Sequence, residues 1–147
     1  MLLLVVVLVA GCGSDRLSRE KLVERANGIC ESYNTQQNSL PFPSTDPTSP
    51  ATTFRERAQW GAALNQIVNL GRAEMAALHK LKPPEELEPA WNRLLAAKDS
   101  SYDSLSASAE AAKRNRPAAL KRIGAVSRKK LTKVTSLADA FGVKECG

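Results

Sequence analysis

Residues 53–84 read TFRERAQWGAALNQIVNLGRAEMAALHKLKPP and carry the clearest helix signals in the chain. Thr53 and Glu56 match a capping box, in which the threonine hydroxyl and the glutamate carboxylate bond free backbone N–H groups of a first helical turn. Small or apolar residues then recur at spacings of three and four, which places them on one helical face. That face contains Trp60, Leu64, Ile67, Gly71, Met75 and Leu78. The two prolines after Lys82 end the pattern, because proline lacks a backbone donor and restricts the residue before it. We therefore expect a helix of about eight turns.

One helix is expected before this segment and another at the end of the chain. Ser18 is a good N-cap residue for the first, and the apolar residues after it share one face. That face contains Leu22, Val23, Ala26, Ile29, Cys30 and Tyr33. The last helix begins with Pro117 at its first position and ends at Gly142, which can adopt the left-handed cap conformation. Its expected buried side contains Leu120, Ile123, Ser127, Leu131, Val134, Ala138 and Phe141.

The helix expected after the proline corner begins near Glu86 and keeps Pro89 in its first turn, where a missing backbone donor is tolerated. Its apolar seam contains Leu87, Trp91, Leu94, Tyr102, Leu105, Ala109 and Ala112. Lys98 interrupts this seam. We expect the aliphatic stem of Lys98 to pack among apolar neighbours and its amine to reach solvent.

Four amphipathic helices without any strand pattern predict an all-α fold. We expect an antiparallel helical bundle of about four helices, in which the last helix runs beside the first. Residues 38–52 separate the first two helices and hold four prolines, so this segment is expected to be an extended loop. A proline-rich ligand for another domain is the alternative interpretation of this loop.

The first twelve residues indicate export. Residues 2–10 are an unbroken apolar run, too short to span a bilayer, which needs about 20 apolar residues. An apolar run closed by small residues is typical of a removable secretory signal. No basic residue follows Met1, although a start codon further upstream would supply one.

Residues 8–12, LVAGC, resemble the lipobox of bacterial lipoproteins, in which the cysteine thiol receives a diacylglyceryl group and becomes the mature N-terminus. The resemblance implies a lipoprotein signal peptide at 1–11 and a lipidated tether at 12–17 anchored through Cys12. The helical-bundle domain that the helix patterns predict then covers residues 18–147. The alternative is an ordinary signal peptide in which Cys12 is incidental.

The other two cysteines are expected to form a disulfide. With Cys12 assigned to the lipid, Cys30 and Cys146 remain as one pair, and an exported chain occupies an oxidising compartment. A bond between them would join the chain end to the first helix. Closing a loop of this length contributes on the order of 4–5 kcal/mol by the chain-entropy argument.

Three short segments carry a wider resemblance. Residues 26–30, ANGIC, residues 81–87, LKPPEEL, and residues 141–147, FGVKECG, together look like a set of small secreted or lipidated helical proteins of actinobacteria. This resemblance spans most of the mature chain. It implies an extracytoplasmic helical bundle with a disulfide, and it brings no established activity with it.

The sequence offers little for catalysis, so we expect no enzyme. His79 is the single histidine, and neither a Gly-rich phosphate loop nor a C-x-x-C metal spacing is present. We expect no metal and no cofactor. Met75 and His79 share a helical face and so could serve as haem ligands, but a C-x-x-C-H attachment site is missing.

The most distinctive surface feature is basic. Between residues 111 and 138 there is no Asp or Glu, whereas nine cations occur: Lys113, Arg114, Arg116, Lys121, Arg122, Arg128, Lys129, Lys130 and Lys133. One interpretation is a solvated face that keeps the protein soluble. The other is contact with an anionic surface, in keeping with the net charge of +6. Export argues against nucleic acid as the partner.

We therefore predict a cell-envelope lipoprotein, anchored on the extracytoplasmic side of the cell membrane, that binds rather than catalyses. Its basic last helix would face an anionic envelope polymer, the membrane or another envelope protein. The alternative is a carrier of a small apolar ligand within the bundle. Five small residues could permit a cavity, although such residues more often let helices approach closely: Gly61, Ala62, Gly71, Ala109 and Gly124.

Overall fold

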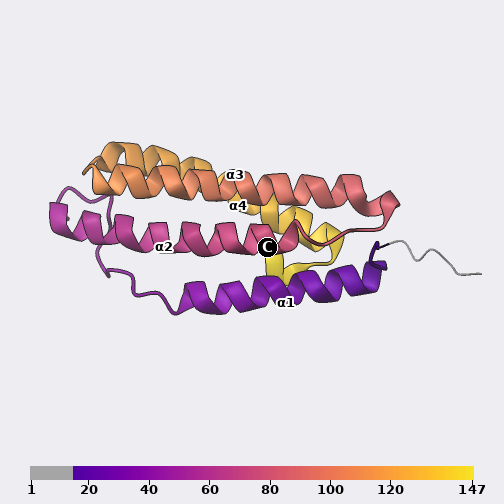
Figure 1. The fold of residues 1–147 in the computed structure, drawn as a ribbon. Coiled ribbons are helices and arrows are strands. Elements are labelled where there is room, and N and C mark those ends of the chain that lie inside the picture. Colours follow the sequence, from indigo (N-terminus) through magenta and orange to yellow (C-terminus); the bar gives the residue numbers. More distant parts are fainter. Residues whose placement is uncertain (1–14) are drawn as a thin grey trace, which may run out of the picture.

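The fold is an all-α, up-down-up-down arrangement of antiparallel helices (Figure 1). A computed structural model describes residues 15–147, and no strand occurs among them. The elements are α1 (Arg19–Asn38), α2 (Phe54–Leu78), η1 (Glu85–Leu87), α3 (Glu88–Lys113), α4 (Pro117–Phe141) and η2 (Lys144–Cys146), where η marks a short 3-10 helix. The predicted fold class is confirmed. The predicted signal peptide and the lipidation site Cys12 lie outside the described residues.

Local capping signals set most of the helix ends. The Ser18 hydroxyl accepts a hydrogen bond from the Lys21 backbone, and Thr53 and Glu56 form the predicted capping box. At the end of α4, Gly142 has a φ of 97°, and the Val143 N–H bonds the Ala138 carbonyl oxygen at 2.9 Å. These are the features of a Schellman cap.

The corner between α2 and α3 is longer than predicted. Helix α2 ends at Leu78 rather than near Lys82, because the backbone tightens into i→i−3 hydrogen bonds at Lys80 and Leu81 before the prolines. Helix α3 begins at Glu88 after the η1 turn instead of near Glu86. Pro89 lies in the first turn of α3, as predicted.

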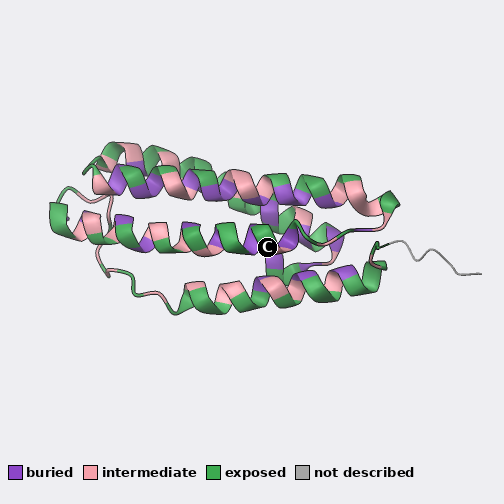
Figure 2. Cartoon of the chain, in the orientation of Figure 1, coloured by how far each residue is buried: buried purple, intermediate pink, exposed green. Residues whose placement is uncertain are grey.

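Helices α2 and α3 pack closely at two glycines. A Cβ atom on Gly71 would lie 2.1 Å from Cε1 of the Tyr102 ring, and one on Gly61 would lie 2.9 Å from the Ala109 carbonyl oxygen. Side chains from the other helix therefore fill the space that these glycines leave. Buried positions follow the inner sides of the helices along the bundle (Figure 2).

Helix α1 is attached differently from the other three. No Cα atom of α1 lies within 8 Å of one in α4. The two helices still contribute to one hydrophobic core, and η2, which folds back from α4, contacts both of them. The Cys30–Cys146 disulfide joins η2 to α1, as predicted. Asn34 Nδ2 also donates to the Glu145 carbonyl oxygen at 2.7 Å.

The prediction that Leu131 lies on the buried side of α4 is wrong. Its exposed fraction is 46%. Since α1 does not cover this part of α4, the leucine faces the open seam between the two helices. Leu120, Ser127, Val134, Ala138 and Phe141 are buried as predicted, and Ile123 is half-buried.

The proline-rich loop is fastened to the bundle by Arg57, which is only 5% exposed. The Arg57 guanidinium donates to the carbonyl oxygens of Pro47 at 3.1 Å and Ser49 at 2.5 Å, and to Asn115 Oδ1 at 2.5 Å. Trp60 Nε1 adds a hydrogen bond to the Thr45 carbonyl oxygen at 2.8 Å. One buried arginine thus connects the loop, α2 and the α3–α4 corner.

Candidate functional site

A buried ion pair and a neighbouring phenol form a cluster in the interior of the bundle, which we call the buried triad: Glu74, Lys98 and Tyr102. Lys98 Nζ lies 3.1 Å from Glu74 Oε1, and Tyr102 donates to Glu74 Oε2 at 2.5 Å. Lys98 Nζ also donates to the Cys146 carbonyl oxygen at 2.9 Å. The prediction that the Lys98 amine reaches solvent is wrong, because Glu74 and η2 supply partners inside the core.

The chemistry of the buried triad is that of a structural cluster. Glu74 is 0% exposed and Lys98 is 6% exposed, so a substrate has no access to the ion pair. Burial, followed by the charge of Glu74, raises the pKa of the Tyr102 hydroxyl. The phenol therefore stays protonated and keeps donating to the carboxylate. A hollow of about 190 Å³ borders Lys98 and Tyr102 on the α1–α4 seam, which is smaller than ordinary ligand pockets of roughly 300–1,000 Å³.

The nine predicted surface cations fall into two groups. Lys113, Arg114 and Arg116 lie at the α3–α4 corner. There Lys113 Nζ and an Arg114 Nη atom come within 3.4 and 3.7 Å of Glu110 carboxylate oxygens. The other six, which we call the α4 cations, are Lys121, Arg122, Arg128, Lys129, Lys130 and Lys133.

Within residues 15–147 the α4 cations form no ion pair. No described carboxylate oxygen lies within 4.0 Å of any of their nitrogen atoms. Five of the six are exposed, and Lys130 is half-buried. Within residues 15–147, Lys130 Nζ is the only side-chain nitrogen of this group that makes a hydrogen bond, which it donates to the Ser100 carbonyl oxygen at 3.0 Å.

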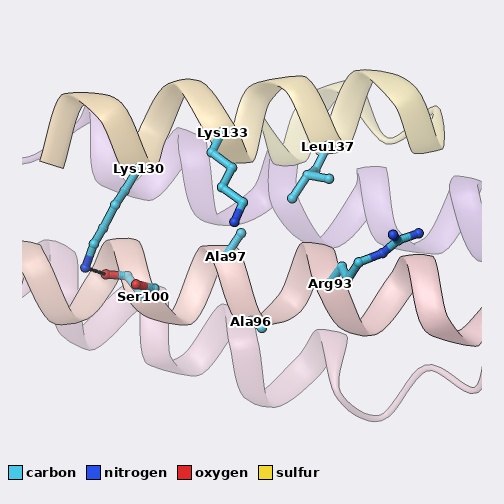
Figure 3. Close-up of a pocket in the computed structure, with 7 residues that line it drawn as sticks. All are labelled: Arg93, Ala96, Ala97, Ser100, Lys130, Lys133 and Leu137. Carbon is cyan, nitrogen blue, oxygen red and sulfur yellow. Dashed lines mark hydrogen bonds between the residues drawn. The ribbon is translucent and has the colours of Figure 1, made fainter. Parts of the chain in front are cut away.

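Two of the α4 cations line a groove between α3 and α4 (Figure 3). Its volume is about 390 Å³. We call it the α3–α4 groove, and its lining residues are Arg93, Ala96, Ala97, Ser100, Lys130, Lys133 and Leu137. The view shows Lys130 at one end above Ser100, Arg93 toward the other, and Lys133 extended toward Ala97 between them. No carboxylate is among the lining residues.

The sequence patterns did not predict that Arg93 lines this groove. Its position two residues after buried Trp91 and one before buried Leu94 places it beside the apolar seam. The α4 residues that face Arg93, however, depend on how the two helices pack.

A second hollow of about 350 Å³ continues along the same two helices and shares Lys130, with Arg122 and Val126 among its lining residues.

Neither a haem pair nor a metal set is assembled among residues 15–147. Met75 is 3% exposed in the core, whereas His79 is exposed and lies 3.4 Å from Asp99 Oδ2. No group of three or more His, Cys, Asp or Glu residues in the described part of the chain could hold a metal ion. The helices of this part include none that is long and apolar enough to cross a membrane.

The small residues proposed as cavity formers mostly serve close packing. Gly61 meets the Lys113 stem and the Ala109 carbonyl, and Gly71 meets the Tyr102 ring. A Cβ atom on Gly124 would have only Arg128 Nη1 nearby, at 4.0 Å. Ala62 is exposed.

No protein family, no curated protein and no solved structure matches this chain.

Proposed function

We propose that the protein is a lipid-anchored, extracytoplasmic binding module of the cell envelope that uses the α4 cations to hold an anionic envelope component. The observation that carries this proposal is that none of the α4 cations forms an ion pair with a carboxylate within residues 15–147. Like charges three or four residues apart destabilise a helix slightly, as with Lys129 and Lys133. These charges therefore do not serve the stability of α4, and an external anion would neutralise them.

The anchor is supported by the LVAGC motif and by how the chain enters the bundle. The Leu17 N–H bonds the Lys82 carbonyl oxygen at 2.8 Å, and Arg16 Nη1 lies 2.7 Å from Glu88 Oε2. Residues 15–17 thus dock on the α2–α3 corner. Cys12 is three positions before Asp15 in the sequence, and a chain of that length spans at most about 11 Å. Lipidation at Cys12 would therefore hold this corner near the membrane. We call this end of the bundle the anchored end.

The anchored end itself is not strongly basic. Glu85 and Glu86 are exposed there, and Arg16 is paired with Glu88. The α4 cations begin at Lys133, eight residues before the end of α4, and continue away along the helix. At 1.5 Å per residue they lie about 12–30 Å from this end. The basic surface is therefore a side of the bundle and not its base.

The anchor and the disulfide are tested together by intact mass. We expect protein purified from membranes of its native host to begin at Cys12 and to carry a diacylglyceryl group. Two further thiols should become alkylatable only after reduction. A chain without lipid would contradict the anchor.

The binding role is tested by lysine labelling of the full chain reconstituted into vesicles. An amine-reactive reagent should modify Lys121, Lys129 and Lys133 more slowly in phosphatidylglycerol-containing vesicles, or with isolated anionic wall polymer, than in phosphatidylcholine vesicles alone. High salt should remove the protection, because exposed charges are screened. Lys80, exposed at the anchored end in both vesicle types, reports the slowing that closeness to an anionic membrane alone produces. Equal labelling under all conditions would contradict the proposal.

A further inference from the structure

The α3–α4 groove opens close to the anchored end. Arg93 lies five residues into α3, and Leu137 lies four residues before the end of α4. With a rise of 1.5 Å per residue, these positions are about 6–8 Å from the two helix ends. The Lys130 end of the groove is farther away, by about two helical turns. Among the α4 cations, the two that line the groove, Lys130 and Lys133, are thus the nearest to the proposed membrane surface.

The groove has an unneutralised positive charge. Within residues 15–147, Arg93 and Lys133 make no side-chain hydrogen bond or ion pair, and Lys130 bonds only the Ser100 carbonyl oxygen. The α3 carboxylates have partners away from the groove: Asp103 lies 3.4 Å from Arg72 of α2, and Asp99 lies 3.4 Å from His79, the residue that follows α2. A phosphate group in the groove would therefore meet cations from both helices and no lining carboxylate.

The floor of the same groove is apolar. Ala96 and Ala97 lie on α3 and Leu137 on α4, and Figure 3 shows the Lys133 side chain reaching across toward Ala97. A hydrophilic polyanion would gain nothing from this floor. An acyl chain would bury apolar surface on it, at roughly 25 cal/mol per Å². The combination of cations and aliphatic floor matches a molecule that is anionic at one end and apolar at the other.

We infer that the α3–α4 groove binds one anionic phospholipid of the anchoring membrane. The phosphate lies among Lys130, Lys133 and Arg93, and one acyl chain runs over Ala97 and Leu137 toward the anchored end. The volume of about 390 Å³ accommodates the phosphate and the first part of one chain, within the range of roughly 300–1,000 Å³ for ligand sites. This inference rests on the proposed function and names the ligand of its surface.

Photo-crosslinking tests the inference. The full chain is reconstituted into vesicles with phosphatidylglycerol that carries a diazirine on the acyl chain, close to the glycerol. Phosphatidylcholine with the same diazirine chain is the matched probe without net charge. After irradiation, mass spectrometry of peptides locates the lipid. We expect crosslinks at residues 93–100 and 130–137 with the anionic probe, and about fivefold fewer with Lys133→Gln, the size expected for one cation near an anionic headgroup.

A pair of tryptophan variants separates the groove from the charge. Ala96→Trp fills the exposed floor without changing any charge, and Ala76→Trp places the same side chain on an exposed site of α2, outside the groove. We expect Ala96→Trp to abolish the groove crosslinks and Ala76→Trp to leave them unchanged. Crosslinks that survive Ala96→Trp, or that are as frequent with the phosphatidylcholine probe, would overturn the inference.

The two proposals fail in different ways. Lysine protection in anionic vesicles, measured on the Ala96→Trp protein, depends on the unchanged α4 cations and should persist. Protection without groove crosslinks in the unsubstituted protein would overturn the phospholipid site alone. Absence of both would overturn the proposed function as well.

Discussion

The interior and the outer side of this bundle treat positive charge in opposite ways. The buried Lys98 amine contacts the Glu74 carboxylate and donates to the Cys146 carbonyl oxygen. The Tyr102 hydroxyl donates to the same carboxylate. Lys133, on the outer side, has no acidic partner within residues 15–147. A buried charge must be paired because desolvation is expensive, whereas an exposed charge is solvated by water. The comparison therefore separates charges that belong to the fold from charges that are free for a partner.

The largest effect should come from breaking the buried triad at one member. Lys98→Met leaves Glu74 charged and enclosed, so the free energy of unfolding should fall by about 3–5 kcal/mol. Chemical denaturation of the purified protein measures this. The double variant Glu74→Leu with Lys98→Met removes both charges and should recover most of the loss. A loss below about 1 kcal/mol in the single variant would mean that the ion pair is not formed as described.

The next effect concerns the attachment of α1. Replacing both cysteines, Cys30→Ser with Cys146→Ser, should lower the free energy of unfolding by about 2–5 kcal/mol, because the bond closes a loop across 116 residues of sequence separation. Since no Cα atom of α1 lies within 8 Å of one in α4, α1 should lose protection from exchange first. Hydrogen exchange should accelerate in α1 before α2 and α3. Equal acceleration in all helices would contradict this order.

Sequence patterns predicted what depends on neighbours along the chain. Thr53 with Glu56 and Gly142 marked helix ends, because capping involves residues within one turn. The burial of Lys98 was not predictable in this way. It requires Glu74 on another helix and the Cys146 carbonyl, which lies 48 residues further along the chain. Whether a lysine in an apolar seam is paired or solvated depends on tertiary contacts.

The candidate site shows the same division. The α4 cations were visible as a run without Asp or Glu, because charge is a property of composition. The groove was not visible, since it needs Arg93 of α3 to face Lys133 of α4. The prediction for Leu131 failed for a related reason: helical periodicity predicts which residues share a face, but not whether another helix covers it.

A pair of glycine variants sharpens the account of the interior. Gly71→Ala places a methyl group on the Tyr102 ring, so the ring must move and the free energy of unfolding should fall by about 1–3 kcal/mol. Among residues 15–147, no atom outside the local helix backbone lies within 4 Å of a Cβ placed on Gly28, and Gly28 lies at an exposed position of α1. Gly28→Ala should therefore raise stability by up to about 1 kcal/mol. Thermal unfolding of both variants is the measurement, and equal effects would contradict the close Gly71–Tyr102 packing.

Tyr102→Phe tests the hydroxyl of the buried triad through pH. The variant leaves Glu74 Oε2 without its donor, which should lower stability by about 1–2 kcal/mol at neutral pH. The unfolded chain releases the phenol proton near pH 10, whereas burial and Glu74 raise the pKa in the folded state. Stability of the unsubstituted protein should therefore fall as pH rises above about 10. The variant lacks this dependence, so its deficit should shrink in alkaline denaturation experiments, and a constant deficit would contradict the raised pKa.

The smallest effect on stability, and the sharpest contrast with Lys98, is expected on the outer side. Replacing three α4 cations, Arg128→Gln, Lys129→Gln and Lys133→Gln, removes no ion pair within residues 15–147. Each change should alter the free energy of unfolding by less than about 0.5 kcal/mol.

The same triple variant should nevertheless lose the protection that anionic vesicles give to Lys121 and Lys130. The matched control, Arg19→Gln, Lys21→Gln and Arg25→Gln, removes the same charge from exposed positions of α1 and should keep that protection. If both triple variants weaken protection equally, net charge alone attracts the protein to the surface. If only the α4 variant does so, the position of the cations on the bundle is what the anionic partner recognises.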